Sequence, residues 1–180
     1  MHFLYYSSSC SLFGCRLKTD DTTRAAPAAH VNYSLVKFQM VKTEPIPPEL
    51  LQAYAETHYI VHHEAPFVMH IGQPCLELKA LMVDHNALSA AFITAWNPFS
   101  QNLPTKENQA RQDELKANLK KRGLICIDGI GKHPSNSWPG EVSVLALGLD
   151  LEAAKSLARH YEQHAFVWAV GDGVPDLVQP

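Results

Sequence analysis

The chain has 180 residues, of which 46% are hydrophobic and 18% are charged, and its formal net charge is -3. This length suits one domain with a proper core, and the composition excludes a chain that is disordered throughout. The small negative charge gives no reason to expect a nucleic-acid partner. No apolar run approaches the ~20 residues that cross a bilayer, so we expect a soluble, cytoplasmic protein without a membrane partner.

Residues 1–39 differ from the rest of the chain because they show no sustained hydrophobic period. They lack the basic start and the apolar run of ~7–15 residues that mark a signal peptide. Residues 12–15 loosely resemble a lipoprotein cleavage box, although Phe13 fits it poorly, whereas Met40 precedes a Pro-rich entry to a helix. We therefore expect residues 1–39 to be a disordered extension or a mis-called start, and residues 40–180 to form a single α+β domain.

Hydrophobic period and turn residues predict alternating helices and strands in the first half of this domain. Leu78, Leu81 and Met82 recur on one helical face. Residues 63–66 form a turn signal between two short apolar runs. The predicted elements are, in chain order, a helix over 49–56, strands over 59–61 and 67–71, and a helix over 74–85.

The second half of the domain carries the clearest pattern. Residues 90–93 are apolar on both faces, as in a central strand, Gly123 stands where a helix ends, and Asp150 is a good helix N-cap. The predicted elements are a strand over 89–96, a helix over 104–122, strands over 124–130 and 141–149, a helix over 151–163, a strand over 165–170 and a short edge over 174–178. The order β-α-β-β-α-β predicts a ferredoxin-like core with an N-terminal helix-hairpin-helix addition.

Four segments of this second half resemble one known family. They are residues 92–100 (FITAWNPFS), 108–112 (NQARQ), 138–141 (WPGE) and 165–168 (AFVW). Their order and spacing are similar to those of a bacterial family called domain of unknown function 3293, over about residues 45 to 178. The resemblance implies no activity. It also puts any role for paired carboxylates in doubt, because Val142 stands where the family often carries a second acid after Glu141.

The corner after the strand over 89–96 is the first candidate site. Asn97 and Ser100 lie in the loop there, with Thr94 just before it, and Asn108 and Arg111 lie on the following helix. Amides, an arginine and a helix N-terminus together suit an anion or a carboxylate. The alternative is that the asparagines only hydrogen-bond the loop backbone and fix the turn.

The loop before residue 141 is the second candidate site. Trp138 could stack on a ring, and Glu141 could act as a general base, with His133 nearby in sequence. The alternative is that Trp138 covers the core and Glu141 satisfies loop amides.

The two candidate sites are predicted to lie far apart. Taking the strands over 89–96 and 141–149 as adjacent and parallel, Asn97 ends one strand and Glu141 begins the other. Seven residues at ~3.3 Å each would then separate them by ~20 Å or more. The sequence therefore predicts two corners at opposite ends of the sheet.

Metal and cofactor sites are not predicted. His58, His62, His63 and His70 cluster around a hairpin, but no HExxH or comparable ligand spacing accompanies them. The four cysteines form no CxxC pair. No P-loop, GxGxxG or GxSxG motif is present.

Three functions of different classes remain open from the sequence. The first is a small-molecule or anion-binding module, for which a ferredoxin-like fold also allows a regulatory role. The second is a hydrolase-type enzyme that uses Glu141 or His133, which predicts a closed pocket holding one of them with a perturbed pKa. The third is a protein-protein interaction module that pairs through the sheet face or its edge, and the oligomeric state is not predicted.

Overall fold

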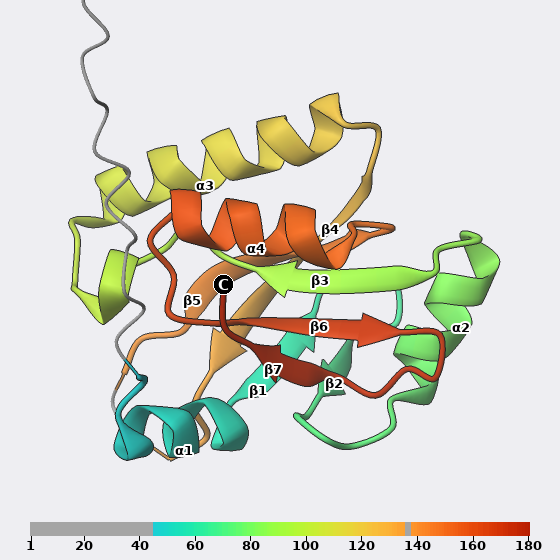
Figure 1. Ribbon diagram of the computed structural model, residues 1–180, viewed down its shortest axis with the longest axis horizontal. Helices are drawn as coiled ribbons and strands as arrows, with labels where there is room; N and C mark the ends of the chain where they lie inside the picture. Colours follow the sequence, from blue (N-terminus) through green and yellow to red (C-terminus); the bar gives the residue numbers. More distant parts are fainter. Residues whose placement is uncertain (1–44, 136–137) are drawn as a thin grey trace, which may run out of the picture. The chain divides into compact units, whose positions relative to one another are not determined.

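An antiparallel sheet of seven strands forms the centre of the computed structural model, which describes residues 45–135 and 138–180 (Figure 1). The strand order is β2-β1-β4-β5-β3-β6-β7. The strands are β1 (His58–Val61), β2 (Phe67–Met69), β3 (Ser89–Ile93), β4 (Ile125–Lys132), β5 (Glu141–Leu147), β6 (Phe166–Val170) and β7 (Asp176–Val178).

Four α-helices and one short 3-10 helix accompany the sheet within the described residues. They are α1 (Pro48–Glu56), α2 (Leu76–Asp84), η1 (Pro98–Ser100), α3 (Thr105–Lys121) and α4 (Leu151–His160). α3 and α4 lie together on one face of the sheet (Figure 1). The Asp150 carboxylate caps α4 by accepting a hydrogen bond of 2.8 Å from the Ala153 N–H, as its type and position predict.

The central strands are buried on both faces because their side chains alternate between two cores. Ala91 and Ile93 of β3 pack in the core formed with α3 and α4. Ala90 and Phe92 point to the opposite face, where they share a second core with β1, β2 and α2. Every residue of β3 is therefore buried, which explains why its sequence is apolar from Ala90 to Ile93.

Helix α1 differs from the other helices. None of its nine residues is fully buried, so it contributes little to either core. Its attachment includes a hydrogen bond of 2.8 Å from the Tyr59 hydroxyl to the Tyr54 carbonyl oxygen. Its Glu56 carboxylate also lies 3.0 Å from His133 Nε2.

The expected mixture of helices and strands is confirmed, and each predicted element over the described residues corresponds to an observed one. The division of the chain at residue 40 lies outside the described residues and stays a prediction. Over the part of the chain that the structure describes, no helix combines the length and apolarity needed to cross a membrane.

The prediction that the strands over 89–96 and 141–149 run parallel is wrong. β3 and β5 are neighbours but antiparallel, with Ile93 opposite Val144. The error concerns the direction of β5. This strand pairs antiparallel with β4 on one side and antiparallel with β3 on the other. The carboxyl end of β3 consequently lies beside the amino end of β5, which brings the two candidate sites to the same edge.

Gly129 in β4 is required by close packing. A Cβ at this position would lie 2.5 Å from Phe92 Cε2 and 2.6 Å from the Ile60 carbonyl oxygen. We expect Gly129→Ala to lower the free energy of unfolding by about 1–3 kcal/mol, because overpacking forces neighbours to move. Chemical denaturation measures this. Gly171→Ala is the matched control, since a Cβ there meets nothing within 4 Å, and equal stability of the two variants would contradict the prediction.

Candidate functional site

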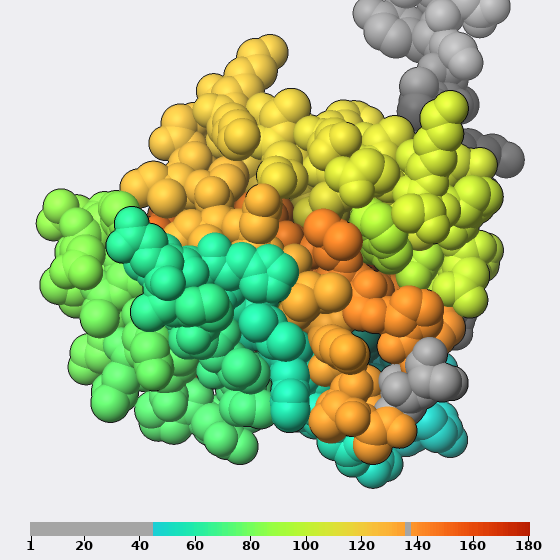
Figure 2. Space-filling view, turned by 180° about the vertical axis from the view of Figure 1, so that it is seen from behind, coloured from blue at the N-terminus to red at the C-terminus, as the bar shows by residue number. Residues whose placement is uncertain are grey.

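A cavity of about 290 Å³ lies between α1 and the sheet, at the edge where β3 ends and β5 begins. Figure 2 shows the segments around β4 and β5 lying next to α1 on the surface. The wall of the cavity is largely apolar and includes five aromatic side chains: Tyr54, Tyr59, Phe92, Trp138 and Phe166. Eight other polar side chains line it among the described residues: Thr57, Thr94, Asn97, Ser100, His133, Glu141, Ser143 and Gln163.

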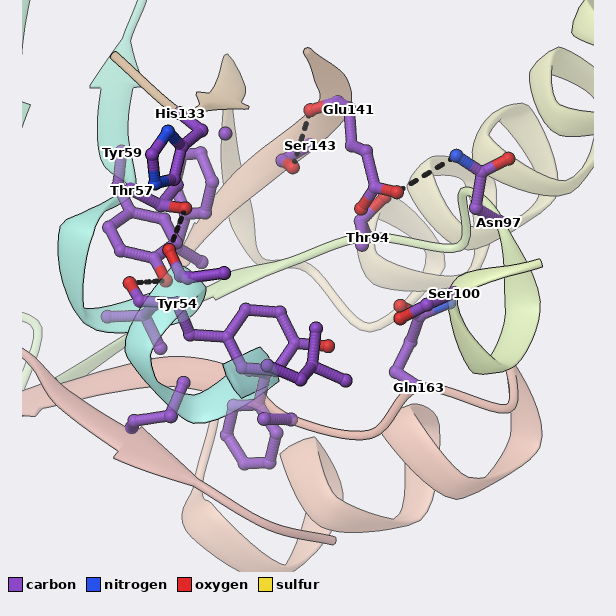
Figure 3. A pocket seen from close by; sticks show the side chains of 18 of the residues that line it. Tyr54, Thr57, Tyr59, Thr94, Asn97, Ser100, His133, Glu141, Ser143 and Gln163 are labelled. Atoms are coloured by element: carbon purple, nitrogen blue, oxygen red, sulfur yellow. Dashed lines mark hydrogen bonds between the residues drawn. The ribbon is translucent and has the colours of Figure 1, made fainter. Parts of the chain in front are cut away.

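The Glu141 carboxylate is held in this cavity by hydrogen bonds to one of its two oxygens (Figure 3). Its Oε1 accepts hydrogen bonds from Asn97 Nδ2 at 2.9 Å and from Trp138 Nε1 at 3.4 Å. Its Oε2 accepts none from the described residues. Burial raises the pKa of Glu141, and the hydrogen bonds from Asn97 and Trp138 offset part of that rise. One carboxylate oxygen is thus fixed, and the other is available to a ligand.

Asn97 is itself held in place by a second amide. Its backbone N–H donates to Asn108 Oδ1 at 2.8 Å, and Asn108 Nδ2 donates to Asn97 Oδ1 at 2.7 Å. The Leu103 N–H also donates to Asn97 Oδ1, at 3.2 Å. Because Asn97 Oδ1 is an acceptor twice, its Nδ2 must face Glu141. Both asparagines are buried, so this network orients the carboxylate from within the fold.

Thr94 and Gln112 join the end of β3 to its neighbours. The Thr94 hydroxyl donates to the Val142 carbonyl oxygen at 2.7 Å and accepts from the Trp96 N–H at 3.0 Å. Gln112 Oε1, on α3, accepts from the Ala95 N–H at 2.8 Å. These contacts fix the backbone that carries Asn97, and they leave the Thr94 hydroxyl committed to backbone groups.

Arg111 does not line the cavity. Its Nε donates to the Ala95 carbonyl oxygen at 3.0 Å, and its Nη2 donates to the Tyr161 carbonyl oxygen at 2.8 Å. The same Nη2 lies 3.4 Å from the Glu162 carboxylate. The guanidinium therefore connects the end of β3 with the end of α4, where it satisfies carbonyl groups.

The rim of the cavity carries an unusual backbone. Of the five described non-glycine residues with positive φ, four lie here: Asn97 (45°), Phe99 (48°), Ser100 (57°) and Glu162 (58°). Asparagine tolerates this region, whereas a bulky residue such as Phe99 is rare in it. The Phe99 N–H donates to the Glu162 carbonyl oxygen at 2.7 Å, which ties the two segments together. Such strain concentrates at functional sites.

The cavity joins residues that the sequence analysis had separated. Thr94, Asn97 and Ser100 line it together with Trp138 and Glu141. The expected distance of ~20 Å or more between the two corners is wrong, since Asn97 Nδ2 and Glu141 Oε1 lie 2.9 Å apart. Asn108 stands behind Asn97 and does not reach the cavity, and His133 is an additional lining residue.

Several lining residues were missed by the sequence analysis. Leu50, Ala53 and Tyr54 lie at helical spacing on α1 and face the cavity; this short apolar stripe was a readable signal. Gln163 follows α4, and its Nε2 donates to the carbonyl oxygens of Trp96 and Tyr161, at 3.0 and 3.1 Å. No sequence period singles out Gln163, because it lies outside a helix or strand.

The histidines and cysteines form no metal centre within the described ranges. There, no group of three or more His, Cys, Asp or Glu side chains is placed to hold a metal ion. His58 and His70 pack ring against ring, with centroids 4.9 Å apart. Cys75 is buried, and burial raises its pKa, which disfavours the reactive thiolate.

Comparison with known proteins identifies one family. The family model described as protein of unknown function (DUF3293) matches residues 93–166. No curated protein and no solved structure gave a significant match. The matched segment contains Asn97, Asn108, Trp138 and Glu141, whereas α1 precedes it.

The raised pKa of Glu141 predicts a stability cost at neutral pH. A carboxyl group whose folded pKa exceeds its unfolded value binds its proton more tightly in the folded state. The free energy of unfolding therefore falls as pH rises from the ordinary value of 4.5 through the folded pKa. We expect Glu141→Gln to become progressively more stable than the wild type over this window, by about 1.4 kcal/mol for each unit of pKa rise.

Denaturation of both proteins below the ordinary glutamate pKa and at neutral pH measures this difference, because all other carboxyl groups cancel. Glu64→Gln, at an exposed turn position, is the control and should show no such trend. A stability difference that does not change with pH would rule out a desolvated Glu141.

Proposed function

Since residues 93–166 of the chain belong to the DUF3293 family, whose description assigns no activity, we propose from the geometry that the protein binds a small organic molecule. The ligand occupies the cavity between α1 and the sheet and donates a hydrogen bond to Glu141 Oε2. One observation carries this proposal: a partly buried carboxylate is held through one oxygen by Asn97 and Trp138, while its other oxygen has no partner among the described residues.

The chemistry of the cavity supports a small-molecule ligand. Its volume of about 290 Å³ is near the lower end of the ~300–1,000 Å³ typical of ligand pockets. A largely apolar wall with a few convergent polar groups is also typical of such pockets. The desolvation of Glu141 costs stability without any gain to the core, and groups of this kind concentrate at functional sites.

The anionic ligand suggested by the sequence is less well supported than the small molecule itself. Arg111 is committed to two carbonyl oxygens and to Glu162. It also lies outside the cavity wall, to which Glu141 contributes a carboxylate. Coulomb repulsion between this carboxylate and an anion disfavours that pairing.

Fragment screening by NMR tests the proposal. We expect fragments that bind to shift the backbone resonances of residues 93–100 and 138–143. Glu141→Gln should weaken their affinity at least tenfold, about 1.4 kcal/mol, because the ligand loses a charge-assisted hydrogen bond. Glu64→Gln should leave affinity unchanged. Arg111→Met should lower stability and should reduce affinity less than Glu141→Gln does, because Arg111 does not line the cavity.

Two results would refute binding at this site. One is a fragment set that shifts residues around Arg111 while leaving those around Glu141 unaffected. The other is full affinity in Glu141→Gln, after circular dichroism has shown that the variant is folded.

A second candidate function is an enzyme in which Glu141 is the general base. The observation that favours it is the combination of a cavity and a raised pKa at Glu141, since a base with a pKa closer to neutrality is a better proton acceptor at working pH. In a hydrolytic reaction, Glu141 would take a proton from water as the water oxygen attacks the substrate. His133 is the weaker alternative, because its Nε2 is engaged with Glu56.

Chromogenic ester, amide and glycoside substrates test this second candidate. We expect hydrolysis to rise with pH through the raised pKa of Glu141, because only the carboxylate accepts a proton. Glu141→Gln should lose ~10²–10⁴-fold of the rate, whereas Glu64→Gln should retain it. Absence of hydrolysis with all three classes, or equal rates in both variants, would remove this candidate and leave ligand binding intact.

We also propose that β3 to β6 with α3 and α4 form a ferredoxin-like core. The spatial order β4-β5-β3-β6, all antiparallel, supports it, as does the position of α3 and α4 on one face (Figure 1). The site would then lie on the opposite face of that core, where α1 adds a wall.

A further inference from the structure

We infer that the ligand of this cavity is an organic amine, bound as its ammonium ion with the nitrogen at Glu141 and an apolar body among the aromatic side chains. The inference rests on the proposed function and adds the chemical class of the ligand. Three features carry it: the charge of the wall, the balance of free donors and acceptors, and the aromatic surroundings.

The charge of the described wall is negative. Glu141 is the carboxylate among the described lining residues, and neither lysine nor arginine is found there. His133 is the lining side chain that could carry a positive charge. Its Nε2 lies 3.0 Å from the Glu56 carboxylate, so a charge on this ring would be paired with Glu56. The described wall therefore supplies no lysine or arginine partner for Glu141.

Several polar groups of the wall offer acceptors while their own donors are engaged. Asn97 Nδ2 donates to Glu141, the Thr94 hydroxyl donates to Val142, and Gln163 Nε2 donates to Trp96 and Tyr161. Glu141 Oε2 and Gln163 Oε1 accept no hydrogen bond from the described residues. Both side chains reach into the cavity (Figure 3). A ligand that matches these two acceptors brings donors, and an ammonium group brings up to three.

The remaining surroundings suit an organic cation. Tyr54 enters from α1 on the side of the cavity opposite Glu141 (Figure 3), and Phe92 and Phe166 form part of the apolar wall. Aromatic faces attract cations, with about 0.5–2 kcal/mol per contact. The Tyr54 hydroxyl stays protonated because burial raises its pKa, so it adds no second negative charge.

Three ligands with the same body and different charge test the inference. Benzylamine, benzyl alcohol and benzoate are titrated into the full chain by calorimetry at neutral pH. We expect benzylamine to bind at least tenfold more tightly than benzyl alcohol, and benzoate to bind most weakly. Glu141→Gln should abolish the preference for the amine over the alcohol, and Glu64→Gln should keep it.

A pH series on the wild type supplies a test that needs no variant. Benzylamine affinity should fall as pH decreases through the raised pKa of Glu141, because the protonated carboxyl loses its charge, whereas benzyl alcohol affinity should stay level. Equal affinities for amine and alcohol, or tighter binding of benzoate, would overturn the amine inference while leaving a ligand-binding cavity. Binding of none of the three would also overturn it, and the fragment screen would then decide the proposed function separately.

Discussion

The antiparallel pairing of β3 with β5 determines where the polar side chains of the site lie. This pairing places the carboxyl end of one strand beside the amino end of the other. Asn97, just beyond β3, can therefore reach Glu141, the first residue of β5. A parallel pair would have left each side chain alone at its own end of the sheet, and neither would have formed a site.

The site is supported from the opposite side of the sheet. Asn108 and Gln112 are buried on α3 and hold the loop after β3 through amide hydrogen bonds. Arg111 ties the same loop to the end of α4. The amide oxygens of Asn108 and Gln112 are engaged, whereas Gln112 Nε2 is buried without a hydrogen-bond partner among the described residues. The backbone at the end of β3 is thus held from α3, while α1, β6 and β7 also contribute lining residues to the cavity.

Local sequence patterns predicted the elements well, and long-range geometry less well. The apolar run 90–93 and the cap at Asp150 act within a few residues, so they were readable. The alternative that Asn108 hydrogen-bonds the loop backbone was also readable, and Asn108 Oδ1 does accept from the Asn97 N–H. The relative direction of β3 and β5 depends on the hairpin between β4 and β5, and the predicted parallel direction was wrong. The left-handed backbone at Phe99 and the position of Gln163 arise from tertiary contacts, which leave no local signature.

Because α1 is largely exposed, the folding of this helix is coupled to ligand binding in the cavity. None of its residues is fully buried, so opening it costs less free energy than unfolding the core. Leu50, Ala53 and Tyr54 nevertheless face the cavity. Suppose that a molecule binds only while α1 is packed over the cavity. Its binding then stabilises the packed state of α1, and the packed state of α1 strengthens the binding by the same coupling free energy. In this fold, ligand affinity and helix order are consequently two measures of one equilibrium.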